Sequence, residues 1–149
     1  MEGWYTLISF ALGFLVAQLW KLVVGLITGH RTREVVNLRT AIGYFSRSGG
    51  MPSGHTASFT AASVYLGLVF GFGSGLFALA ACTWMIVVYD AIHVRYAVGE
   101  QGKALNGLLR KAGKKELPLV EGHTLPQVVV GAIIGVMIAV GMFYMVGGA

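Results

Sequence analysis

Four runs of apolar residues, each close to the length of a membrane-crossing helix, dominate the sequence: residues 4–28, 55–72, 75–93 and 125–146. A helix needs about 20 residues to cross the hydrocarbon core of a bilayer. Charged residues make up only 11% of the chain, less than half of the share of about 25% in a typical soluble domain. The sequence therefore excludes a water-soluble globular protein and predicts a single membrane domain over residues 1–149.

The expected fold class follows from the need of backbone N–H and C=O groups for hydrogen-bond partners inside the bilayer. Only helices and closed barrels pair all their backbone groups inside a bilayer, and the four runs lack the strict alternation of barrel strands. We therefore predict an all-α integral membrane protein with four transmembrane helices. A short Gly/Ser-containing link joins runs 55–72 and 75–93, which predicts an antiparallel helical hairpin.

Two polar segments, residues 29–53 and 94–124, contain ten of the eleven Lys and Arg residues. With four spans, both segments lie on the same side of the membrane. Cytoplasmic loops are enriched in Lys and Arg, so we predict that both loops lie in the cytoplasm and that both termini lie outside. The expected location of the protein is a bacterial-type cytoplasmic membrane. This topology accounts for the net charge of +5, and we expect no nucleic-acid partner.

Each polar segment contains an amphipathic stretch. In residues 98–112 the apolar side chains recur at helical spacing, and the charged ones lie largely on other faces. This pattern predicts an interfacial helix on an anionic leaflet. Residues 37–45 show a weaker pattern of the same kind.

Ionisable residues near membrane depth gather at the ends of the spans that face these two loops. Such residues are costly in a bilayer and usually face a bundle interior or mark a site. They are Lys21, His55, Asp90, His93, Arg95 and His123. Because no similar cluster forms at the opposite ends of the spans, we predict a functional site at the cytoplasmic face.

The strongest local motif is Gly-Gly-Met-Pro-Ser-Gly-His, residues 49–55. Glycine lets the backbone approach a ligand closely, and Pro and Ser suit the start of a helix, where free N–H groups bind anions. Ser53 and Gly54 are candidates to bind phosphate oxygens, and His55 to donate a proton. The structural alternative is a capped helix start with an interfacial histidine.

A second motif begins the last span, with His123 followed by Pro126, Gly131 and Gly135. The two glycines, four residues apart, predict a close helix-packing face that brings this span against a helix carrying site residues. Glycine-rich faces also permit a homodimer. His123 is a catalytic candidate, with a structural interfacial role as the alternative.

Together the two motifs resemble the type 2 phosphatidic acid phosphatase superfamily, which includes lipid phosphatases and vanadium haloperoxidases. Pro-Ser-Gly-His is intact at residues 52–55, and the short, divergent branch of the superfamily is matched further along the chain. Those matches are Ala17-Gln18…Lys21, Gly49–Ser53, Tyr89-Asp90-Ala91…Val94-Arg95, Leu105-Asn106 and Gly122–Thr124. The resemblance extends over about residues 17–135.

Three of the superfamily's usual residues are absent from their places. No Arg-Pro follows Lys21, Leu117 stands where an arginine precedes the histidine, and Gln127 stands where an acid follows it. We hypothesise that Lys21 and Arg95 bind phosphate instead, and that Asp90 orients His123. Asp90 also has a structural alternative, pairing with Arg95 or Lys21.

The resemblance implies a lipid phosphatase that needs no metal or other cofactor. His123 would be the nucleophile, forming a phosphohistidine, and His55 the general acid and base. Lys21, Ser53, Gly54 and Arg95 would bind the phosphoryl oxygens. The expected substrate is a lipid made on the cytoplasmic leaflet: phosphatidate, phosphatidylglycerophosphate or a prenyl diphosphate.

Two alternatives remain at this stage. The missing motif residues leave room for a membrane protein that binds phospholipids or anions without turnover. A small transporter subunit is a weaker alternative, because the polar residues stop at one membrane face instead of crossing the bilayer.

Overall fold

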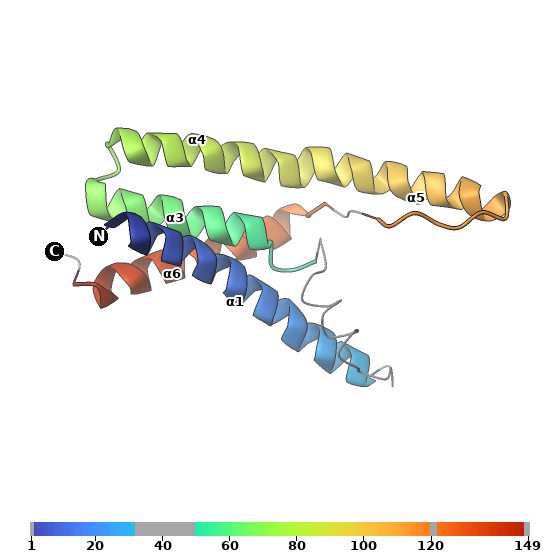
Figure 1. Ribbon diagram of the computed structural model, residues 1–149, viewed down its shortest axis with the longest axis horizontal. Helices are drawn as coiled ribbons and strands as arrows, with labels where there is room; N and C mark the ends of the chain where they lie inside the picture. The colour runs from blue at the N-terminus through green and yellow to red at the C-terminus, as the bar shows by residue number, and fades with distance from the viewer. Residues whose placement is uncertain (1, 32–49, 120–121, 148–149) are drawn as a thin grey trace.

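The computed structural model describes residues 2–31, 50–119 and 122–147, and every regular element in these ranges is helical, as predicted (Figure 1). The predicted interfacial helix at residues 37–45 lies outside the described residues. The elements are α1 (Glu2–Arg31), α3 (Gly54–Phe70), α4 (Gly75–Tyr89), the π-helical turn η1 (Asp90–Val94), α5 (Arg95–Lys111) and α6 (Leu125–Met145).

Three described helices are long and apolar enough to cross a membrane: residues 3–27, 75–111 and 125–145. The remaining predicted span, residues 55–72, corresponds to α3, which has 17 residues. This helix ends at Phe70 because Gly71 takes a φ of 87°. At 1.5 Å per residue α3 is about 26 Å long, somewhat shorter than the hydrocarbon core of about 30 Å. The predicted span of about residues 55–72 extends two residues beyond the end of this helix.

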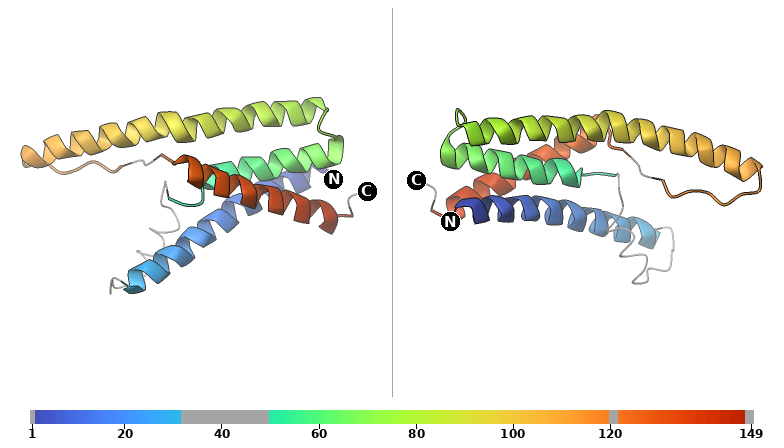
Figure 2. Two further views of the ribbon diagram at one scale, coloured as in Figure 1. Left: turned by 180° about the vertical axis from the view of Figure 1, so that it is seen from behind. Right: turned by 45° about the horizontal axis from the view of Figure 1, so that its top comes forward.

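The helix α3 occupies the centre of the bundle, packed against α1, α4 and α6 (Figures 1 and 2). Its buried face consists mainly of small residues, Gly, Ala, Ser and Thr. The predicted hairpin with α4 is confirmed, and two hydrogen bonds hold it. Trp84 Nε1 donates to Thr60 Oγ1 at 2.7 Å, and Ser63 Oγ donates to the Ala80 carbonyl at 3.2 Å.

Glycines let the backbones of these helices touch. A Cβ placed on Gly131 would lie 2.6 Å from the Ser53 carbonyl oxygen, and one on Gly135 would lie 2.6 Å from that of Ala57. On the other side of α3, a Cβ on Gly13 of α1 would lie 2.7 Å from the same Ala57 oxygen. The predicted packing face of residues 131 and 135 is confirmed, and it sets α6 directly against the start of α3.

The segments α4, η1 and α5 form one continuous helix of 37 residues that extends beyond the bundle as an arm (Figure 1). The sequence predicted a span that ends at residue 93 and a separate interfacial helix over 98–112. The helix over residues 98–112 is present, but the predicted break between it and the preceding span is absent. Residues 93–98 contain no Pro, Gly or capping residue that would end a helix, and the π turn continues the backbone hydrogen bonding.

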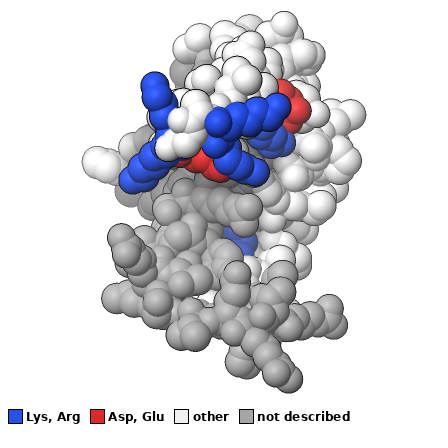
Figure 3. All heavy atoms as spheres, turned by 90° about the vertical axis from the view of Figure 1, so that its right-hand side faces the viewer, with Lys and Arg blue, Asp and Glu red and all other residues white. Residues whose placement is uncertain are grey.

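Beyond α5 the chain turns at Gly113, with a φ of 67°, and returns along the arm. Asn106 fixes the returning segment, since its amide donates to the Leu117 carbonyl at 2.9 Å and accepts from the Leu117 N–H at 2.8 Å. Exposed basic side chains gather around the arm (Figure 3). They are Lys103, Arg110, Lys111, Lys114 and Lys115.

The described ends of the chain lie together at the end of the bundle opposite the arm (Figure 1). This arrangement matches the predicted topology, in which both termini share one side and the polar segments the other. The protein is an integral membrane protein, and the side of the membrane that the arm faces remains a prediction.

Candidate active site

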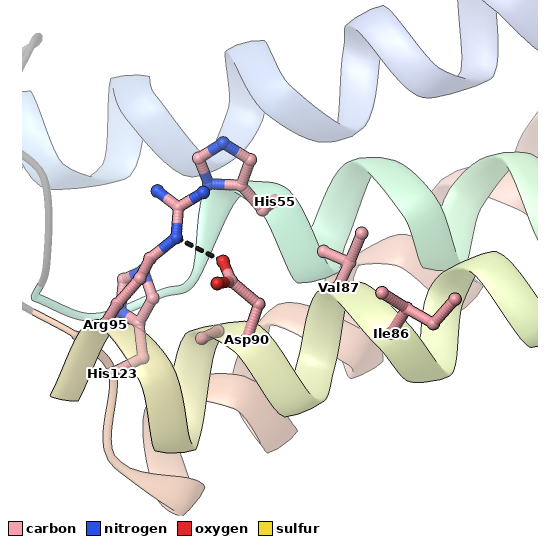
Figure 4. Close-up of a pocket in the computed structure, with 7 residues that line it drawn as sticks. His55, Ile86, Val87, Asp90, Arg95 and His123 are labelled. Atoms are coloured by element: carbon pink, nitrogen blue, oxygen red, sulfur yellow. Dashed lines mark hydrogen bonds and ion pairs between the residues drawn. The ribbon is translucent and has the colours of Figure 1, made fainter. Parts of the chain in front are cut away.

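A pocket of about 310 Å³ lies where the start of α3 meets the π turn and the segment before α6. Four predicted site residues line it: His55, Asp90, Arg95 and His123. Figure 4 shows their side chains pointing toward one another from three separate parts of the chain. The rest of the lining is apolar, from Ile86, Val87 and Ala91.

Ser53 is fully buried and caps α3. Its hydroxyl oxygen accepts from Thr56 N at 3.4 Å and Thr56 Oγ1 at 2.9 Å, while its own N–H donates to the Gln127 carbonyl at 3.0 Å. Ser53 therefore joins α3 to α6. The first hydrogen bond of α3 comes from Ala57 N, so the N–H groups of Gly54 and His55 precede the helical ladder and suit an anion.

Two contacts fix the position of His123: a hydrogen bond of its own backbone and the close packing of the residue before it. Its N–H donates to the Ala91 carbonyl at 3.0 Å, which attaches it to the π turn. The preceding Gly122 is pressed against the start of α5, where an added Cβ would lie 2.3 Å from Tyr96 N. A larger residue at position 122 would displace His123, so the Gly-His-Thr motif has a steric basis.

The ring of His123 contacts Gln127, the residue at the place of the superfamily's acid. Nδ1 of His123 lies 3.3 Å from Gln127 Oε1. An amide oxygen only accepts hydrogen bonds, so the contact with Gln127 favours a proton on Nδ1, and the ring has a further hydrogen bond with the backbone of Gly50. The same Oε1 accepts from Thr124 N at 3.0 Å and completes a capping box at the start of α6.

Opposing effects act on the pKa of His123, and burial is the largest of them. The ring is only 4% exposed, and burial lowers its pKa below the ordinary 6.5. The hydrogen bond to Gln127 acts in the opposite direction, and the charge of Lys21 lowers the pKa further. A neutral imidazole is the form that can act as a nucleophile.

Asp90 and Arg95 form an ion pair across the π turn, with Arg95 Nε donating to Asp90 Oδ2. Both side chains are partly exposed to the pocket. The hydrogen bond that the structure gives Asp90 is to Arg95, which matches the structural alternative, and Gln127 contacts the His123 ring instead. The π turn creates this pair because its i to i+5 spacing puts the first and sixth residues on one face.

Like the buried Ser53, two other predicted polar residues lie outside the pocket lining. Lys21 is half-buried on α1, and its charge acts on both His55 and His123. His93 is exposed and stacks on Tyr89 with ring centroids 4.4 Å apart. Lys21 therefore belongs to the electrostatic surroundings of the site, whereas His93 stands apart from it.

Sequence reasoning missed two contributors: the amide of Gln127 and the carbonyl of Ala91. The first has a readable signal, because Thr124 followed three residues later by Gln127 is a capping-box pattern. The carbonyl of Ala91 leaves no side-chain signal, since any residue at this position presents the same group.

We compared the chain with known protein families, with curated proteins and with solved structures. The family described as the divergent PAP2 family matches residues 4–138. The chain belongs to the divergent PAP2 family. It is also 32% identical over 114 residues to the uncharacterized membrane protein YuiD of Bacillus subtilis (strain 168), covering 65% of this chain and 72% of that protein. No solved structure matches the chain.

The family match includes every residue that lines the pocket, from His55 on α3 to His123 before α6, and also Lys21 and Gln127. The site of this divergent PAP2 protein is thus built within the region that defines the family. In this chain an amide, that of Gln127, is in hydrogen-bond contact with the ring of His123.

Replacing Gln127 by glutamate in this divergent PAP2 protein is expected to raise the pKa of His123. A carboxylate beside Nδ1 favours the imidazolium, whereas burial now lowers the pKa. The imidazole would therefore gain its proton at a higher pH than in the wild type. Histidine NMR titration of the protein in detergent measures this shift directly.

Gln101→Glu is the matched control, since it adds the same charge at an exposed position on α5. It should leave the His123 titration unchanged. A Gln127→Glu protein whose His123 titrates as in the wild type would contradict the Gln127 contact.

Proposed function

We propose that this protein is a membrane lipid phosphatase that hydrolyses a phosphomonoester or diphosphate of a lipid at the cytoplasmic interface. The observation that carries the proposal is the arrangement of His123, with Nδ1 bonded to Gln127 and its ring facing the pocket of His55 and Arg95. A neutral nucleophile, a second imidazole and a cation beside a helix N-terminus are the groups that phosphoryl transfer needs.

In the first step Nε2 of His123 attacks phosphorus. The P–N bond forms as the P–O bond to the leaving group breaks, and protonated His55 gives its proton to the departing oxygen. The products are a phosphohistidine, neutral His55 and the leaving group, which is a lipid alcohol from a phosphomonoester or a lipid monophosphate from a diphosphate. Gln127 supports this step because a hydrogen bond from Nδ1–H to its amide oxygen favours the tautomer whose lone pair is on Nε2, and attack requires the ring to release its hydrogen bond with the Gly50 backbone.

In the second step water attacks the phosphohistidine. Neutral His55 accepts the proton of the water, the new P–O bond forms, and the P–N bond breaks with its electron pair returning to Nε2 of His123. Inorganic phosphate leaves, and His55 is again protonated for the next cycle. One imidazole thus acts as acid and then as base.

The developing negative charge is met by three groups. We assign this role to the N–H groups at the start of α3, to the guanidinium of Arg95 in the pocket and to the ammonium of Lys21, whose charge acts on both histidines. Fixed donors of this kind stabilise the equatorial oxygens without reorganising during the reaction. Arg95 can serve here while Nε stays bonded to Asp90, because its guanidinium carries further donors.

A lipid substrate suits the walls of the pocket. Ile86 is 69% exposed and lines the pocket with Val87, so the pocket continues into the apolar outer surface of α4. Acyl or prenyl chains can remain in the membrane while the phosphate reaches the charged end. Phosphatidate, phosphatidylglycerophosphate and prenyl diphosphates all fit this description.

Phosphate release by the purified protein in detergent, with EDTA present, tests the proposal on a panel of these three lipids. We expect release from at least one of them that EDTA does not abolish. Failure to release phosphate from every lipid would contradict the proposal.

A second candidate is a protein that binds lipid phosphate without turnover. It is favoured by the amide at position 127, in place of a carboxylate, and by the ion pair that engages Arg95. Vanadate binding without phosphate release from any lipid would identify this function.

A further inference from the structure

A second hollow of about 270 Å³ lies further along the bundle, away from the arm. Residues of α1, α3 and α4 line it. The helix α3 lies between α1 and α4, which both pack against it and, among the described residues, make little contact with each other (Figures 1 and 2). The hollow is therefore part of a furrow that has α3 as its floor and α1 and α4 as its walls.

The furrow begins at the pocket of the candidate active site. On α3, His55 lines the pocket and Phe59 lines the hollow. On α4, Val87 lines the pocket and Thr83 lines the hollow. Residues four apart lie on the same face of a helix, one turn from each other. The pocket and the hollow thus follow one another along the same furrow, with the charged groups at one end.

Aromatic side chains of α1 repeat this one-turn step on the other wall. Phe14 packs edge-on against His55, with ring centroids 6.4 Å apart. Phe10, one turn earlier, lines the hollow and packs edge-on against Phe59 at 5.1 Å. All three helices therefore present one residue beside the start of the furrow and a second one turn further along it.

The hollow offers a hydrocarbon surface. Its lining contains two hydroxyl groups, and both already donate to backbone carbonyls of α4. Ser63 Oγ donates to the Ala80 carbonyl at 3.2 Å, and Thr83 Oγ1 donates to the Leu79 carbonyl at 2.9 Å. The other lining residues are apolar. An ordered water needs two to four polar partners, so the chemistry of the hollow favours an apolar occupant.

The length of the furrow matches a hydrocarbon chain. Leu66 lines the far part of the hollow, 11 residues after His55, which is about 16 Å along α3. One leaflet of the hydrocarbon core is about 15 Å thick, half of about 30 Å. An extended chain of single bonds advances about 1.2 Å per bond, as the reach of an extended polypeptide shows, so about 14 carbon atoms fill the furrow.

We infer that the furrow binds one hydrocarbon chain of the lipid substrate while the phosphate occupies the pocket, and that the furrow's length sets the preferred chain length. This inference rests on the proposed function and adds the apolar half of its substrate. Continuity with the pocket favours the substrate's own chain over a chain of the surrounding bilayer, since only the former is attached to a group in the pocket.

The test measures phosphate release in detergent from a series of single-chain alkyl phosphates. For the wild type we expect kcat/KM to rise with chain length up to about 14 carbon atoms and to change little beyond it, because further carbons leave the furrow. Ala62→Phe should shorten the furrow, since Ala62 lines the hollow seven residues after His55, about 10 Å along α3.

In Ala62→Phe the rise should therefore end at about 8 carbon atoms. Its kcat/KM for the 14-carbon phosphate should fall about 10-fold or more, while the shortest phosphates are hydrolysed as by the wild type. Thr83→Phe places the same ring on the opposite wall, seven residues before Asp90. It should give the same result, and it replaces Ala62→Phe if that variant fails to fold.

Ala78→Phe is the matched control, because Ala78 is exposed on α4 and lines neither the pocket nor the hollow. It should keep the chain-length profile of the wild type. All variants are measured in the same micelles, so the partitioning of long chains into detergent is equal and cancels in the comparison.

Three results would overturn the inference while leaving the phosphatase function in place. The wild-type rate could be independent of chain length, or Ala62→Phe and Ala78→Phe could share one profile, which would assign the furrow to bulk lipid. A folded Ala62→Phe protein that loses activity equally at every chain length would assign Ala62 to the fold of the site.

If phosphate is released from no lipid, the proposed function fails and the furrow is tested by binding of the same alkyl phosphates. The rise in thermal stability should then grow with chain length up to about 14 carbon atoms in the wild type and in Ala78→Phe, but only to about 8 in Ala62→Phe. Identical profiles in the three proteins would overturn the inference.

Discussion

The His123→Ala protein is expected to lose at least about 10³-fold in kcat for phosphate release from a lipid phosphate, because His123 is the residue proposed to form the covalent intermediate. His55→Ala should lose about 10²- to 10⁴-fold, the usual contribution of a general acid and base. Phosphate release from purified proteins in detergent measures both losses. His93→Ala is the matched control, since His93 is an exposed histidine that stacks on Tyr89 outside the pocket.

The two histidine variants differ in a second measurement. On an aryl phosphate, whose leaving oxygen needs no proton, His55→Ala should still transfer the phosphoryl group to His123 but hydrolyse it slowly. Acid-labile phosphohistidine should therefore accumulate in His55→Ala and be absent from His123→Ala. Phosphate release that persists in His123→Ala at the wild-type rate would contradict the proposed mechanism.

The Gly135→Leu substitution should separate α6 from α3 and so lower both the stability and the activity of the protein. A Cβ at this position would lie 2.6 Å from the Ala57 carbonyl oxygen, and backbone cannot yield as a flexible side chain can. Overpacking of this kind costs about 1–3 kcal/mol or more. Activity should fall as well, because the bond from Ser53 N to the Gln127 carbonyl holds the two halves of the site together.

Thermal unfolding in detergent and phosphate release together measure this effect. Gly141→Leu is the control on the same helix, since a Cβ there meets nothing within 4 Å. The close approach of α3 and α6 would be disproved by a Gly135→Leu protein as stable and active as Gly141→Leu.

Much of this fold can be predicted from the sequence because a chain inside a bilayer must pair its backbone groups in helices or in a closed barrel. Long apolar runs predict helices, and the paired glycines at positions 131 and 135 predict the α3–α6 contact that the structure shows. The continuous helix through residues 90–98 was harder to predict. It depends on one i to i+5 turn, and a shift of one residue in hydrogen bonding leaves no trace in hydrophobic periodicity.

The candidate site was predictable in its members but less so in their pairings. His55, Asp90, Arg95 and His123 share one pocket, as the clustering of polar residues predicts. Which acceptor contacts His123 depends on backbone geometry. The capping box at the start of α6 turns the amide of Gln127 toward the ring, whereas the π turn directs Asp90 to Arg95.

The central position of α3 has a consequence for biogenesis. A short helix whose buried face is Ser, Thr, Ala and Gly gains little from entering lipid alone, so we expect it to insert together with α4 as a hairpin. His55 then reaches the membrane before its partner is synthesised. Because His123 precedes α6 and the Ser53 N–H bonds to the Gln127 carbonyl, we expect the candidate site to stay incomplete in a nascent chain until its last helix is in place.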